Sequence, residues 1–235
     1  MSTIPAGYDL LETIPGETHV IFPNALPIPA DFFHKGSAPF TGTIHLEGYP
    51  IREFHDPRTR KKHKTGTTDT VVERKTDVTI KSVGGTGTTE IELVQLSLRG
   101  SINVQVGSST QVWDVHVSAS HSKRSTGTMT FTQTSEHGGV FASELQVVAH
   151  FRFERRSDGA ERHLDMGAMK IAEEKQALVA RANTLTSSEV QWLDSHPAGG
   201  SALVIPDLAN LAVATSNSEA AQWAAHGVGG AHLQE

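Results

Sequence analysis

Residues 94–106 read VQLSLRGSINVQV, and apolar residues occupy every second position on both sides of Gly100. The apolar positions are Val94, Leu96, Leu98, Ile102, Val104 and Val106. Successive side chains of a strand point to opposite faces of a sheet, so this pattern predicts a strand with one buried and one wet face. Gly100 is expected to form a bend or a bulge within it.

The same alternation returns in residues 113–119, 128–134 and 145–153, and Trp113 is expected to point inward. Gly/Ser-rich turns separate these runs, which is typical of antiparallel strands with one buried face. Shorter strands are predicted at residues 19–22, 41–46, 71–80 and just before Gly167. The sequence therefore predicts a mainly β fold, an antiparallel β-sandwich of the jelly-roll or immunoglobulin-like type.

Three regions differ in composition. Residues 1–33 contain five prolines and no Lys or Arg, which predicts an extended, acidic N-terminal arm laid across the sheet. Residues 34–167 hold the sandwich strands. Residues 168–182 change to a helical period with an Ala-rich apolar face, so we expect residues 168–235 to form a helical C-terminal extension.

The C-terminal extension contains an internal repeat with an offset of 30 residues. Each unit opens with a Ser/Thr-rich capping box ending in Glu189 or Glu219, continues to Trp192 or Trp223, and closes with a glycine pair. Short helices of this kind need a surface to dock on. Two alternatives remain open: they pack on the chain's own sheet, or both tryptophans anchor in a partner.

Composition excludes several classes of protein. The net charge of −6 argues against a general nucleic-acid binder, and no stretch of 18 apolar residues predicts a membrane span. The sequence has no cysteine, which excludes disulfides, thiol catalysis and Cys-ligated zinc. Residues 1–11 lack a basic region and an apolar core, so no secretory signal peptide is expected in them.

Several strings of the chain resemble a module that recurs in bacterial, notably planctomycete, secreted and surface proteins. They are PADFF (29–33), GSAPFTGTIHLEGYPI (36–51), DTVVERK (69–75), IELVQLSL (91–98), GTMTFT (127–132), GGVFASELQV (138–147) and HLDMG (163–167). The resemblance implies a β-sandwich-like module in an extracellular or cell-surface setting. It supplies no catalytic residues.

One run of positive charge stands out, in a loop that also contains a proline. Its members are Arg58, Arg60, Lys61, Lys62 and Lys64. Such a patch could bind an acidic partner surface or phosphate, or it could be the solvated tip of a hairpin. No aromatic residues are interleaved for stacking bases.

The chain has 13 histidines, which raises a metal-binding alternative. His116 and His150 are expected on the wet face of neighbouring strands, with His121 and His137 in loops nearby. Cross-strand histidines can share a divalent metal ion, but no HExxH, HxH or HxxxH motif is present on a well-defined element. No GxSxG nucleophile motif occurs, and no catalytic residues are predicted.

These observations favour a non-catalytic structural or adhesive module, without a cofactor, that self-assembles or binds a surface protein through protein–protein contacts. The alternative is a metal-dependent enzyme or metal-binding protein that uses the histidines of the sheet face.

Overall fold

The computed structural model describes residues 2–13, 18–24, 26–57, 59–136 and 138–169, together with five short segments of the C-terminal region. Strands dominate this part of the chain, and no helix occurs within it. The mainly β prediction is therefore confirmed for these residues. No helix long and apolar enough to cross a membrane was found among them.

Two large sheets contain most of the strands. The nine-stranded sheet runs in the order β16 (Thr184–Thr186), β13 (Gly138–Gln146), β12 (Ser125–Ser135), β9 (Thr86–Leu96), β7 (Thr70–Arg74), β2 (Gly7–Thr13), β18 (Asp207–Leu208) and β20 (Trp223–Ala224), with β17 (Val190–Leu193) also pairing with β13. The seven-stranded sheet runs in the order β15 (Glu161–Asp165), β14 (Ala149–Arg155), β11 (Ser109–Ala119), β10 (Leu98–Val106), β4 (Gly42–Gly48), β3 (His19–Phe22) and β19 (Ala212–Val213).

Two small sheets complete the fold: β1 (Ser2–Ile4) pairs with β8 (Val78–Ile80), and β5 (Arg52–His55) pairs with β6 (Lys62–Gly66). The pairings described are antiparallel, apart from the short β18–β2 and β19–β3 contacts, which are parallel.

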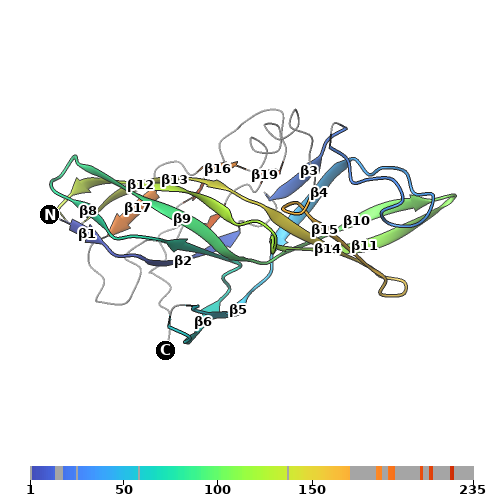
Figure 1. Cartoon of the computed structure of the whole chain (residues 1–235), viewed down its shortest axis with the longest axis horizontal. Coiled ribbons are helices and arrows are strands. Elements are labelled where there is room, and N and C mark those ends of the chain that lie inside the picture. The colour runs from blue at the N-terminus through green and yellow to red at the C-terminus, as the bar shows by residue number, and fades with distance from the viewer. Residues whose placement is uncertain are drawn as a thin grey trace.

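The chain passes repeatedly between the two large sheets, which lie toward opposite ends of the long axis (Figure 1). One crossing is at Ser97, between β9 and β10, where the Ser97 amide donates a 2.8 Å hydrogen bond to the Asp69 carbonyl. Another crossing lies at residues 147–148, between β13 and β14. The predicted runs 94–106 and 145–153 are thus each divided between two sheets.

Gly100 is neither a bend nor a bulge, so this detail of the sequence prediction is wrong. It lies in regular register between Leu46 of β4 and Val115 of β11. A Cβ atom at this position would lie 2.3 Å from the His45 carbonyl oxygen. Glycine is required because β4 and β10 approach closely, and not because the strand turns.

The predicted alternation of burial is confirmed, and one apolar cluster contains residues of both large sheets. Its aromatic centre lies under the seven-stranded sheet, where Trp113 is fully buried as expected. The ring of Phe33 packs 5.3 Å from the ring centroids of both Trp113 and Phe153. Aromatic pairs of this kind each contribute about 0.5–1.5 kcal/mol beyond the burial of apolar area.

Residues 1–33, predicted as an extended arm, contain three strands built into the sheets. The predicted strand at residues 19–22 is confirmed as β3, which pairs with β4. Strand β2 pairs with β7, and its Asp9 is buried and forms a 3.0 Å ion pair with Arg74. This acidic side chain is therefore part of the interior and not of an exposed surface.

The helix predicted over residues 168–182 lies outside the described residues, apart from Ala168 and Met169, which are not helical. The described segments of the repeat region are extended. Strand β17 contains Trp192, which pairs with Gly139 of β13, and strand β20 contains Trp223, which pairs with Leu208 of β18.

Candidate functional site

The outer face of the seven-stranded sheet gathers ionisable side chains into rows that run across the strands. One row follows from the register of β4, β10, β11, β14 and β15: Glu47, Arg99, His116, Arg152 and His163. A neighbouring row contains Ser118, His150 and Asp165. These residues occupy the wet positions of the alternating pattern, so the same periodicity that builds the core also places them together.

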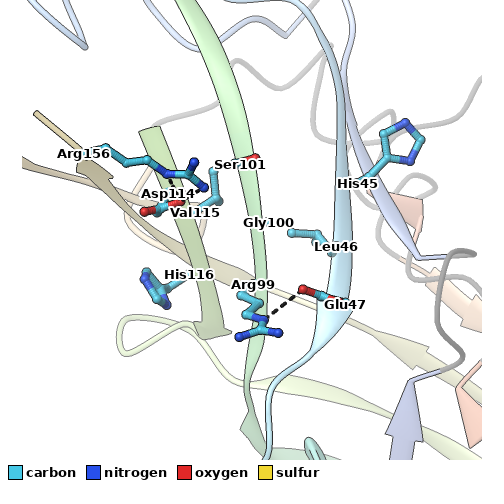
Figure 2. A pocket seen from close by; sticks show the side chains of 10 residues that line it. All are labelled: His45, Leu46, Glu47, Arg99, Gly100, Ser101, Asp114, Val115, His116 and Arg156. Atoms are coloured by element: carbon cyan, nitrogen blue, oxygen red, sulfur yellow. Dashed lines mark hydrogen bonds and ion pairs between the residues drawn. The ribbon is translucent and has the colours of Figure 1, made fainter. Parts of the chain in front are cut away.

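An open groove of about 720 Å³ lies on this face, over strands β4, β10 and β11 (Figure 2). The groove is lined by residues of these three strands and by Arg156, which follows β14. The polar side chains around the groove are His45, Glu47, Arg99, Asp114, His116 and Arg156.

Two ion pairs line the groove (Figure 2). Arg99 Nε lies 2.9 Å from Glu47 Oε1, and Arg156 Nη2 lies 2.7 Å from Asp114 Oδ1. The hydrogen bond from Arg156 holds the pKa of the Asp114 carboxyl below its usual range. The Arg99 guanidinium also stacks 5.2 Å from the ring centroid of Tyr49, an exposed aromatic residue. The groove is thus lined by charges of both signs, already engaged with one another.

His116 stands between the groove and the next strand. Partial burial lowers its pKa, and the positive charge of Arg152 lowers it further, against the opposing effects of Glu154 and Asp114. The imidazole is therefore mainly neutral at pH 7.

The predicted metal ligands are only partly brought together. The ring centroids of His121 and His150 lie 5.4 Å apart, in agreement with the expectation that these two residues are neighbours. His116 lies in the adjacent row, directly opposite the cationic side chain of Arg152. His137 lies outside the described residues.

The structure adds a histidine that the sequence analysis missed. The ring of His163 in β15 stacks on that of His150, with centroids 5.4 Å apart and planes at 13°. A signal for this contact was present, because the turn at residues 157–159 makes β14 and β15 a hairpin. Pairing outward from that turn places residues 150 and 163 on one face as diagonal neighbours.

Asp165 organises the loop that carries His121. Its carboxylate accepts hydrogen bonds from the hydroxyls of Ser120 (2.5 Å) and Ser122 (2.7 Å) and from the Gly167 amide (2.9 Å). Burial alone would raise the pKa of this carboxyl, but the hydrogen bonds outweigh burial and hold the pKa below its usual range.

The basic run forms part of the β5–β6 hairpin, which projects from the body of the molecule (Figure 1). Phe54 packs against Tyr8 at 4.8 Å, and the Tyr8 hydroxyl donates to Asp56, so these contacts anchor the hairpin to β2. Lys62 lies 3.6 Å from Glu53. Arg60, Lys61 and Lys64 are exposed, and Arg58 lies outside the described residues. This patch is separate from the groove.

In the described part of the chain, no group of three or more His, Asp or Glu side chains already stands in a geometry that could hold a metal ion. No family model, curated protein or solved structure matches the chain.

Proposed function

We propose that the protein is a non-catalytic, self-assembling structural or adhesive module, and that a second copy of the chain docks on the outer face of the seven-stranded sheet. The observation that carries this proposal is the pairing of opposite charges along the groove: Glu47 with Arg99, and Asp114 with Arg156. In a twofold contact the same patch meets itself, so the charges in it are matched only when the patch presents both signs. A copy related by twofold symmetry offers each arginine a carboxylate of the other chain.

Burial and charge support a contact surface in preference to a reactive centre. The side chains of Arg99 and Glu47 are 49% and 57% exposed, so they can exchange partners without unfolding any part of the sheet. Exposed Tyr49 lies beside Arg99, and tyrosine and arginine are both enriched in interfaces. Because the chain carries a net charge of −6, two copies repel at long range, so we expect assembly to depend on local charge matching.

The proposal also includes the arrangement of the sheets, the setting of the protein and further contact sites. We infer a β-sandwich-like body, supported by the single apolar cluster to which both large sheets contribute. The resemblance to bacterial surface modules supports a surface setting. Further candidate contacts are the exposed tip of the β5–β6 hairpin and the tryptophan-bearing strands β17 and β20.

Light scattering of the full-length chain over a range of protein and salt concentrations tests the proposal. We expect a dimer that weakens as salt rises, because salt screens exposed charge pairs. Arg99→Glu is expected to abolish the dimer, because it places two carboxylates side by side in each copy.

Lys81→Glu is the matched control. It changes the net charge by the same amount at an exposed position directly after β8 and should leave the dimer intact. Strand β8 lies toward the opposite end of the long axis from β10 and β11 (Figure 1). The double variant Glu47→Arg with Arg99→Glu restores opposite charges and should restore assembly. A wild-type chain that stays monomeric at every concentration, or an Arg99→Glu chain that assembles like wild type, overturns the proposal.

A further inference from the structure

Three histidines from separate elements meet on the outer face of the seven-stranded sheet. His150 comes from β14, His163 from the edge strand β15, and His121 from the loop after β11. His150 lies at the centre, because its ring centroid is 5.4 Å from each of the other two. Strand pairing fixes the backbone beneath two of these side chains, so their proximity does not depend on a mobile loop.

The nitrogen atoms of the central pair have the spacing of two ligands on one ion. His163 Nδ1 lies 3.3 Å from His150 Nε2. Two imidazole nitrogens bound at about 2.0–2.1 Å to one tetrahedral ion are separated by about 3.3 Å. The side chain of His163 is 51% exposed, so its ring is free to turn about χ2 and aim its lone pair at a shared ion.

The second nitrogen of each ring faces an oxygen atom that can accept a hydrogen bond from its N–H group. His150 Nδ1 lies 3.3 Å from the Ser118 hydroxyl, and His163 Nε2 lies 3.6 Å from Glu161 Oε2. When these nitrogens carry the protons, the lone pairs of both rings are on the facing nitrogens. Metal-ligating histidines commonly have such an outer acceptor, which fixes the tautomer.

Charge around the cluster also suits a cation. Asp165 lies opposite His150 in the register and carries its negative charge beside the rings. Arg152 pairs with His163 in the register, but its guanidinium is already bound by Glu154 and Glu161.

We propose that His150 and His163 bind one divalent transition-metal ion of the zinc, copper or nickel class. Loop residue His121 approaches as a third ligand, and water completes the coordination. Imidazole nitrogens select this class of ion over magnesium or calcium, which prefer oxygen. The ion would tie the edge strand β15 and the loop after β11 to the centre of the sheet. This inference is independent of the proposed self-assembly.

Titration calorimetry of the full-length chain with zinc chloride at neutral pH tests the site. We expect one zinc ion per chain and no binding of magnesium at the same concentration. The double variant His150→Ala with His163→Ala should lose the zinc site, and Ser118→Ala should weaken it about 10-fold or more.

The matched control is His19→Ala with His45→Ala, which removes another cross-strand histidine pair, with ring centroids 6.2 Å apart. This control should bind zinc like wild type. Ring nitrogen resonances of His150 and His163 in the wild-type chain give a readout that needs no variant, and zinc should shift both. Absence of zinc binding at one equivalent, unshifted rings, or equal binding by the His150/His163 double variant overturns the proposal.

Discussion

The outer faces of the two large sheets use different chemistry on the same pleated framework. Over β9 and β12 the nine-stranded sheet presents threonines, and the hydroxyls of Thr88 and Thr130 lie 3.2 Å apart across the strands. Over β10, β11, β14 and β15 the seven-stranded sheet presents histidines, arginines and carboxylates. Threonine is sufficient for a soluble, well-paired sheet face. The nine-stranded sheet also carries ion pairs, of Lys75 with Glu73 and Glu92, but in the described part of the chain its histidine-free face lacks the rows of ionisable groups on which both proposals are built.

The two large sheets also differ in how exposed their ion pairs are. In the nine-stranded sheet, Arg74 and Asp9 form an ion pair whose side chains are 1% and 4% exposed. In the seven-stranded sheet, the pair of Arg99 and Glu47 is about half exposed. A buried pair is costly to break, whereas exposed pairs contribute little to stability. Substitutions should therefore affect folding in the first region and binding in the second.

The largest expected effect comes from Asp9→Ala. It leaves the guanidinium of Arg74 buried without this carboxylate, and we expect the free energy of unfolding to fall by about 3–5 kcal/mol. Urea denaturation followed by circular dichroism measures this change. Glu47→Ala in the exposed pair is the control, with an expected loss below about 1 kcal/mol. Equal losses of unfolding free energy in the two variants would contradict the distinction between a buried ion pair in one sheet and an exposed ion pair in the other.

Gly100→Ala is expected to cost about 1–3 kcal/mol, because the new methyl group must displace the β4 backbone at the His45 carbonyl. Ser101→Ala, one residue away, adds no atom and serves as the control. A Gly100→Ala chain with wild-type stability would contradict the close approach of β4 and β10.

A smaller effect concerns pH. Burial, and then Arg152, lower the pKa of His116 in the folded chain, so below the ordinary histidine pKa of about 6.5 the unfolded chain binds more protons. The free energy of unfolding should therefore decrease as pH falls from 7 into this range. His116→Gln should make the decrease shallower, as measured by urea denaturation at several pH values. A steeper decrease in the variant would mean that the sign of the His116 shift is reversed.

The smallest effect is expected on the threonine face. Thr130→Val removes one cross-strand hydroxyl contact but keeps the branched shape, and we expect a change within about 0.5 kcal/mol. Thermal denaturation and light scattering together check that neither stability nor assembly responds. A loss of assembly in Thr130→Val would show that the interaction surface extends to the nine-stranded sheet.

The alternation of residues predicted the central strands and their buried positions, but it missed β2, β5 and β6 and did not indicate the sheet to which each strand belongs. Leu96 and Leu98 are both buried, and the two-residue period continues through Ser97 while the chain changes sheets. A periodic pattern records which side chains are buried and carries no information about the strand that lies alongside. Gly100 was misread for the same reason, because its constraint comes from β4, which is distant in the sequence.

Contacts between distant segments also limited prediction of the candidate site. His121 could be proposed as a neighbour of His150, because it follows the strand that carries His116, and that strand was expected beside the strand of His150. The groove could not be proposed, because Glu47, Arg99 and Arg156 meet only through the order β4–β10–β11 and the loop after β14. Asp9 looked like part of an acidic arm, because its partner Arg74 lies 65 positions later.

Strands of the two sheets alternate along the sequence, and this order affects how the chain folds. Strand β9 belongs to one sheet, β10 and β11 to the other, β12 and β13 to the first again, and β14 and β15 to the second. Neither sheet can be completed until nearly all of residues 7–165 have left the ribosome. Folding should therefore begin late and be cooperative, and it should be slow because pairings between distant strands dominate. Unfinished chains then expose unpaired strand edges for longer than chains whose sheets form one after the other.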